Sequence, residues 1–236
     1  MKVCEVNYSM SGCVYETEQK EEKLETKEEL LATEYHDVRN LIFAKLINTE
    51  RNKSLLETLP HEPVLDLSLV FYLFRNNDPS DEELIISNEM LKNWKVDYFQ
   101  VFEDALSNTR QIMGASIRPL RDLIKDMIQN ISFEIDLDEE EDVMPMYVLT
   151  NHWKRNGAVC ILFWDKVAEL AEQLGSDLLV IPSSIHEVIL IPDGPGISEE
   201  ELNQLIRSVN ESELSPADVL SDHAYRFPLA EGRMMM

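Results

Sequence analysis

The sequence predicts an α+β protein, in which an antiparallel or mixed sheet packs with helices and is preceded by a long charged N-terminal helix. Two observations predict this class. Short runs of Val, Ile and Leu occur in pairs separated by turn residues, and stretches with helical spacing lie between the pairs. The chain has 236 residues, of which 44% are hydrophobic, so it can bury the core of one large domain or two small ones.

The N-terminal segment, residues 1–59, is predicted to contain the charged helix. Its first part is rich in Glu and Lys and is expected to extend from the body, whereas residues 34–58 are expected to form a helix that packs on the body. Pro60 and Pro63 would end this helix. The apolar residues at helical spacing are Leu24, Leu31, Tyr35, Val38, Ile42 and Leu46.

Residues 60–135 are predicted to form a first α+β half. The run from Val64 to Phe74 is apolar on both alternating faces, which is typical of a buried strand, and Leu84–Leu91 is predicted to pair with it. Two helices are expected to follow. Asp97 is the predicted N-cap of the first, and Pro119 lies near the start of the second.

Residues 136–145 are predicted to be an acidic linker between two halves of the chain. Six of the seven residues 136–142 are acidic, and a block of like charges of this density is usually solvated. We expect a mobile or irregular segment here that tolerates replacement by alanine.

The second α+β half, residues 146–236, has the more regular pattern. Asp165 and Gly175 are the predicted N-cap and C-cap of one helix, and Ser198 with Glu201 has the spacing of a capping box that starts another. The predicted strands cover residues 146–151, 158–164, 177–181 and 187–192, and a C-terminal strand within 215–227 closes the fold.

The charge of the chain limits its partners. Lys and Arg number 21 and Asp and Glu number 45, which gives a formal net charge of −24. A field of this sign repels nucleic acid and anionic membranes, so we expect neither to bind directly. The expected partner is another protein, for example one with a basic surface.

The cysteine pattern and the lack of membrane, signal and phosphate-binding segments predict a cytoplasmic protein without a cofactor. Cys4, Cys13 and Cys160 are odd in number and form no CxxC pair, which argues against disulfides and zinc. The sequence has no apolar run long enough for a membrane span, no segment like a signal peptide and no phosphate-binding glycine motif.

Five residues could carry hydrolytic or metal chemistry if the fold brought them together. Ser184, His186 and Glu187 lie close in the sequence, but successive strand residues alternate faces and cannot form a triad. The stretch "PSSIHE" is therefore predicted to be a tight connection between antiparallel strands. Asp222 and His223 could join His186 around a metal ion, although the spacing H-E-x-x-H does not occur. We assign no catalytic, cofactor-binding or metal residue from the sequence.

Several blocks of the sequence together resemble a known family. In order along residues 35–227 these blocks are "AKLINTERNKSLLETLPHEPVLDLSLVFYLF", "ISNEMLKNWKV", "PMYVLTNHWKRNGAVCILF", "LGSDLLVIPSSIHEVILIP" and "VNESELSPADVLSDHAYRF". They are similar to the bacterial domain-of-unknown-function 5688 family. The first 34 residues differ from the usual start of that family. The resemblance implies a cytoplasmic bacterial protein and transfers no catalytic residue.

Two hypotheses on function follow from these observations. The favoured one is a non-enzymatic, acidic module that binds another macromolecule, either as an interaction domain or as an inhibitor. The alternative is a hydrolase or metal-dependent enzyme that uses His186 and His223 with nearby carboxylates, and it requires these side chains to share one pocket.

Overall fold

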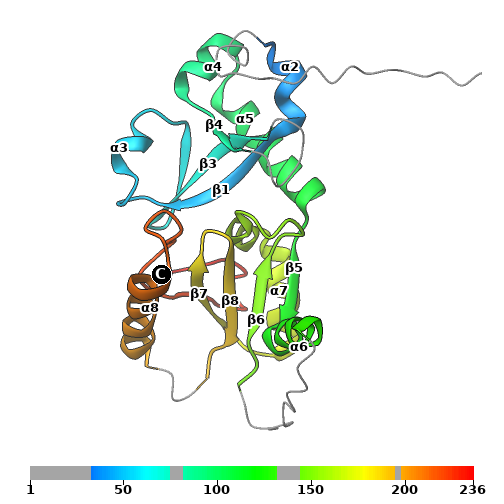
Figure 1. The fold of residues 1–236 in the computed structure, drawn as a ribbon, viewed down its shortest axis with the longest axis vertical. Coiled ribbons are helices and arrows are strands. Elements are labelled where there is room, and N and C mark those ends of the chain that lie inside the picture. Colours follow the sequence, from blue (N-terminus) through cyan, green and yellow to red (C-terminus); the bar gives the residue numbers. More distant parts are fainter. Residues whose placement is uncertain (1–32, 75–81, 132–143, 195–197) are drawn as a thin grey trace, which may run out of the picture.

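The computed structural model describes residues 33–74, 82–131, 144–194 and 198–236. The charged part of the predicted N-terminal helix and the acidic linker, residues 136–142, lie outside the described residues. Two antiparallel sheets stand one above the other along the long axis of the molecule (Figure 1). Helices and antiparallel sheets together confirm the predicted α+β class.

The first sheet has the strand order β1-β3-β2, and β4 also pairs with β3. Its strands are β1 (Ile42–Asn48), β2 (His61–Val64), β3 (Leu67–Leu73) and β4 (Leu84–Ile85). All seven residues of β1 and of β3 are buried, because side chains of both strands pack in clusters with helices and loops around the sheet. The helices of this part are α2 (Tyr35–Val38), η1 (Arg39–Leu41), α3 (Lys53–Leu56), α4 (Asn88–Trp94), α5 (Tyr98–Asn108) and η2 (Thr109–Met113).

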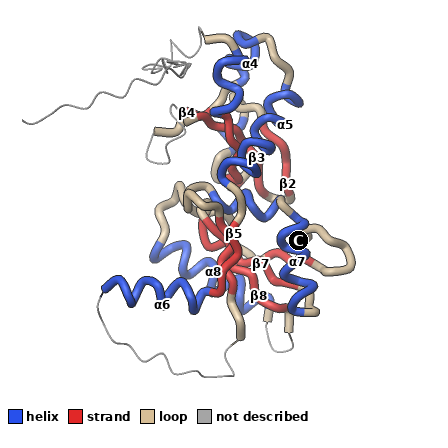
Figure 2. The backbone as a smooth tube through the Cα atoms, turned by 90° about the vertical axis from the view of Figure 1, so that its right-hand side faces the viewer, coloured by secondary structure: helices blue, strands red, loops and turns tan. Residues whose placement is uncertain are grey.

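The second sheet has the strand order β5-β6-β8-β7-β9. Its strands are β5 (Ser116–Pro119), β6 (Tyr147–Thr150), β7 (Leu178–Ser184), β8 (Glu187–Pro192) and β9 (Tyr225–Phe227). Its helices are α6 (Leu120–Ile131), η3 (Gly157–Leu162), α7 (Trp164–Leu174) and α8 (Glu199–Glu213). Figure 2 shows α7 and α8 beside this sheet and α6 reaching away from it. One buried cluster contains side chains of both sheets, so the two sheets share a core.

The prediction of a helix over residues 34–58 is wrong. Short helical turns occupy both ends of this range, but β1 runs through its middle. The residues Val38, Ile42 and Leu46 have helical spacing by coincidence, because every residue of the strand is buried and the apolar run is nearly continuous. A short continuous apolar run cannot be assigned to a strand or a helix from its period alone.

The same ambiguity explains the first two of three further differences. The predicted strand over residues 158–164 is the helical turn η3. The predicted strand Leu84–Leu91 is a two-residue strand followed by α4, which begins after the N-cap Ser87. Helix α7 begins at Trp164, so its N-cap is Phe163 and not Asp165.

The other predicted caps and the predicted hairpin are confirmed. The side chain of Asp97 accepts a hydrogen bond from the Gln100 amide at 2.9 Å, and Ser198 accepts one from the Glu201 amide at 3.4 Å. Gly175 ends α7 in the left-handed conformation. Strands β7 and β8 form the predicted antiparallel hairpin, but its connection is shorter than "PSSIHE": β7 continues through Ser184, and only Ile185 and His186 form the turn.

Candidate functional site

Ser184 and His186 contact backbone groups around the hairpin turn. The hydroxyl of Ser184 accepts a hydrogen bond from the His186 amide at 3.0 Å, and Glu187 begins the return strand. Nδ1 of His186 accepts one from the Asn156 amide at 3.1 Å, which leaves Nε2 facing Oδ1 of Asp218 at 3.6 Å. This is not the order of contacts in a catalytic triad, because the serine hydroxyl contacts the backbone amide of His186 and not its imidazole.

His223 lies in a different group of side chains, which we call the Asp66 cluster: Asp66, Ser221, His223 and Tyr225. Oδ1 of Asp66 accepts a hydrogen bond from the Tyr225 hydroxyl at 2.7 Å. Oδ2 lies 3.1 Å from Nε2 of His223 and 3.4 Å from the Ser221 hydroxyl. Nδ1 of His223 faces the Ala224 carbonyl at 3.0 Å, so both of its ring nitrogens point at oxygen acceptors.

The Asp66 cluster joins the two sheets. Asp66 lies in the turn between β2 and β3, and Tyr225 begins β9 in the other sheet. Burial raises the pKa of the Tyr225 hydroxyl, and the Asp66 carboxylate beside it adds to the rise, so the phenol stays a hydrogen-bond donor. Asp222, which lies between Ser221 and His223 in the chain, accepts hydrogen bonds from Arg51 at 3.0 Å and Asn210 at 2.8 Å.

The candidate residues therefore do not share one set of contacts. His186 contacts Asn156 and Asp218, whereas His223 contacts Asp66 and Ala224. Within residues 33–74, 82–131, 144–194 and 198–236, no group of three or more His, Cys, Asp or Glu side chains is placed to hold a metal ion.

Sequence reasoning missed a second polar group between the sheets, the Glu83 cluster: Lys45, Glu83, Arg155 and Asn156. Glu83 accepts hydrogen bonds from Lys45 Nζ at 2.6 Å, Arg155 Nε at 2.8 Å and Asn156 Nδ2 at 2.7 Å. The Glu83 side chain is only 13% exposed and that of Lys45 10%, so this ion pair is largely withdrawn from water. Burial alone would raise the pKa of the Glu83 carboxyl, but its cationic and amide partners outweigh burial and lower that pKa.

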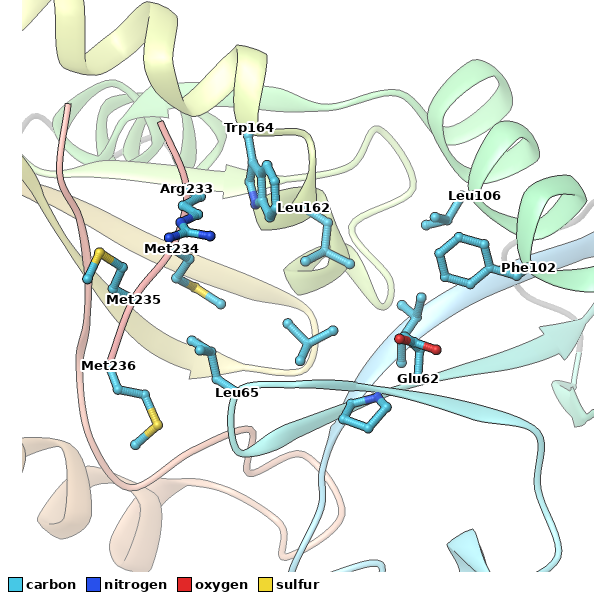
Figure 3. A pocket seen from close by; sticks show the side chains of 13 residues that line it. Glu62, Leu65, Phe102, Leu106, Leu162, Trp164, Arg233, Met234, Met235 and Met236 are labelled. Carbon is cyan, nitrogen blue, oxygen red and sulfur yellow. The ribbon is translucent and has the colours of Figure 1, made fainter. Parts of the chain in front are cut away.

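A pocket between the two sheets, which we call the inter-sheet pocket, could receive a ligand. It has a volume of about 640 Å³, within the usual range for ligand pockets. Its walls come from the β2–β3 hairpin, α5, the start of α7 and residues 233–236 (Figure 3). The lining residues are Glu62, Pro63, Val64, Leu65, Leu69, Phe102, Leu106, Leu162, Trp164, Arg233, Met234, Met235 and Met236.

Among the described residues that line this pocket, two are charged, Glu62 and Arg233, and they lie at opposite ends of it in Figure 3. Glu62 accepts a hydrogen bond from the Tyr98 hydroxyl at 2.8 Å, and Arg233 faces Glu231 at 3.9 Å. Several apolar side chains of the pocket remain open to solvent, among them Leu65 at 42% and Trp164 at 44% exposed. The pocket adjoins the Asp66 cluster, because Leu65 lines it and the next residue binds His223.

The fold and the pocket define an α+β protein with two antiparallel sheets and an apolar site between them. Comparison with known protein families matches residues 4–228 to DUF5688, a family of unknown function, and the chain belongs to this family. The match begins at residue 4, so the expectation that the first 34 residues depart from the family is wrong. Neither the curated proteins nor the solved structures contain a match to this chain.

None of the helices in the described ranges is both long enough and apolar enough to cross a membrane.

Proposed function

We propose that this chain is a non-enzymatic binding module that holds an apolar segment of another protein in the inter-sheet pocket. The observation that supports this function is the pocket itself, in which eleven of the thirteen lining residues are apolar. Exposed apolar side chains that gather around a concave site usually mark an interaction surface.

The lining suits a flexible ligand of variable sequence. Met234, Met235 and Met236 form one wall, and Met235 and Met236 are exposed. Methionine side chains are unbranched and polarizable, so they adapt to partners of different shape. Trp164 and Phe102 supply rigid aromatic contacts of the kind that dominate binding energy.

The charge of the chain suits a partner segment that carries Lys or Arg beside its apolar residues. The net charge of −24 would attract such a segment over a distance and raise its rate of association. Glu62, an exposed acid in the pocket lining, is positioned to meet one of these basic groups.

The partner segment would bind through side-chain contacts in the pocket and not by adding a strand to the first sheet. The wall formed by β2 is an edge of the first sheet, but it contains Pro63, which has no backbone N–H to offer an added strand. The affinity would therefore come from apolar burial in the pocket.

Site-specific photo-cross-linking tests this function. Trp164 is replaced by a photoreactive benzoylphenylalanine in the native host, and Ile112 is replaced in the same way as a control of matched exposure outside the pocket, 44% against 41%. We expect a defined protein to be captured from position 164 and not from position 112.

A second change in the pocket wall makes the test specific. With Leu106→Arg in the same chain, a cation replaces an apolar wall residue, and capture at position 164 should be lost. Equal capture at both positions, or capture that survives Leu106→Arg in a folded protein, would contradict the proposal.

A further inference from the structure

We infer that α6 is a dimerisation helix, which pairs in parallel with α6 of a second copy of this chain about a two-fold axis. Among its described side chains, Leu120 to Ile128, none is buried. Ile124 is 40% exposed and Met127 64% exposed, although both are apolar. This surface is separate from the inter-sheet pocket, so the inference does not depend on the proposed function.

The apolar side chains of α6 form one continuous face. Residues four apart lie in rows along a helix, and α6 has four such rows. The row of Leu120, Ile124 and Ile128 lies next to the row of Leu123 and Met127, so the five apolar residues among the described side chains of α6 lie on one side. Figure 2 shows α6 reaching away from the second sheet, where a partner helix can approach it.

The charged rows of α6 determine which pairing is favourable. Arg121 and Lys125 form a basic row along one edge of the apolar face, and Asp122 and Asp126 form an acidic row along the other edge. In a parallel two-fold pair, the basic row of each helix faces the acidic row of its partner. In an antiparallel pair, rows of the same charge would face each other, so charge complementarity selects the parallel arrangement.

Two exposed methionines lie just before β6, and the backbone of one of them contacts the start of α6. Met144 is 38% exposed and Met146 40% exposed, and the Met146 carbonyl accepts a hydrogen bond from the Leu120 amide at 2.8 Å. The acidic row is partly occupied within the chain, because Asp126 binds Arg118 at 2.7 Å on the surface. A contact of one three-turn helix is small, so we expect a reversible dimer that dissociates on dilution.

Charge reversal combined with mixing tests this pairing. One variant carries Arg121→Asp and Lys125→Asp, and the other carries Asp122→Lys and Asp126→Lys. Each variant alone faces like charges across the two-fold axis and should remain a monomer, whereas an equimolar mixture should form a heterodimer. Sedimentation equilibrium up to about 1 mM should show twice the monomer mass for the natural chain and for the mixture.

Cross-linking checks the orientation of the helices. In a chain with Cys4→Ser and Cys13→Ser, the parallel pair places position 127 opposite itself, so Met127→Cys should give a disulfide-linked dimer on mild oxidation. Val209→Cys on α8, which is 42% exposed, is the control and should not. A natural chain that stays monomeric over the whole range overturns the inference, as does a mixture without heterodimer or equal cross-linking at both positions.

Discussion

Each of the two polar clusters between the sheets has one carboxylate at its centre, but different groups surround the two carboxylates. Glu83 is 13% exposed and faces two cations, Lys45 and Arg155, whereas Asp66 is 33% exposed and faces two hydroxyl groups and a histidine. Removing the charge of a buried carboxylate with cationic partners strongly lowers the free energy of unfolding. A half-exposed carboxylate that accepts hydrogen bonds from hydroxyl groups depends much less on charge. The comparison indicates that the Glu83 cluster fixes the fold, while the Asp66 cluster aligns the hairpin that borders the pocket.

Glu83→Gln should cause the largest loss of stability, because it removes the negative charge that both Lys45 and Arg155 bind. Removing one partner of a buried ion pair typically costs about 3–5 kcal/mol, and we expect about 3 kcal/mol here because Arg155 is partly exposed. Urea unfolding measures this loss. Glu82→Gln, at the exposed neighbouring position, is the control and should change stability by less than about 0.5 kcal/mol. A similarly small change for Glu83→Gln would refute the contrast between the clusters.

The effect of Glu83→Gln should also depend on pH. The pKa of Glu83 is lower in the folded chain, so the ionised carboxylate stabilises the fold above the ordinary glutamate pKa of about 4.3. This stabilisation is lost as the pH falls through the folded pKa. The difference in unfolding free energy between the natural chain and Glu83→Gln should therefore be greatest near neutral pH and shrink below about pH 4. A difference that stays constant between neutral and acidic pH would exclude charge as its cause.

Gly157→Ala should cause the second-largest loss of stability, because Gly157 allows the Glu83 cluster to approach the β7–β8 turn. An added Cβ would lie 2.5 Å from the His186 carbonyl oxygen and 2.7 Å from the Asn151 nitrogen, and would also collide with Thr150. These are largely backbone atoms that cannot yield easily, so we expect a loss of about 2 kcal/mol or more. Thermal unfolding measures it, with Gly194→Ala as a control that meets no atom within 4 Å. Equal melting temperatures for the two variants would rule out this close approach.

Tyr225→Phe should have a smaller effect in the Asp66 cluster. It removes the 2.7 Å hydrogen bond to Asp66 but leaves His223 and Ser221 in contact with the carboxylate. A hydrogen bond of this kind contributes about 1 kcal/mol, which urea unfolding can resolve. A loss of about 3 kcal/mol, as large as that of Glu83→Gln, would show that the two clusters are equivalent.

Ser184→Ala should have the smallest effect, because it removes one local hydrogen bond to the His186 amide in the turn. We expect a loss of about 0.5 kcal/mol and no change in cross-linking at position 164. A change in cross-linking at position 164 without a change in stability would indicate that Ser184 has a functional role.

The sequence predicts the local parts of this structure and misses those that depend on distant residues. The β7–β8 hairpin was predictable because two apolar runs and their turn lie together in the sequence. His223 was identified as a candidate, but its partner Asp66 lies 157 residues earlier, and no local pattern connects them. Glu83 and Arg155 are 72 residues apart, and the pocket draws its lining from several separate segments. A buried strand such as β1 was misread because burial on both faces removes the alternation that marks a strand.

The most direct test of the account is the methyl NMR spectrum of the methionines when the pocket is filled. The segment captured by cross-linking at position 164 is synthesised as a peptide and added to the chain, in which the methionine methyl groups carry ¹³C. We predict shifts for Met234, Met235 and Met236, which line the pocket, and none for Met90 and Met113, which are fully buried away from it. Unchanged Met234–Met236 signals with bound peptide would contradict the claim that the inter-sheet pocket is the binding site.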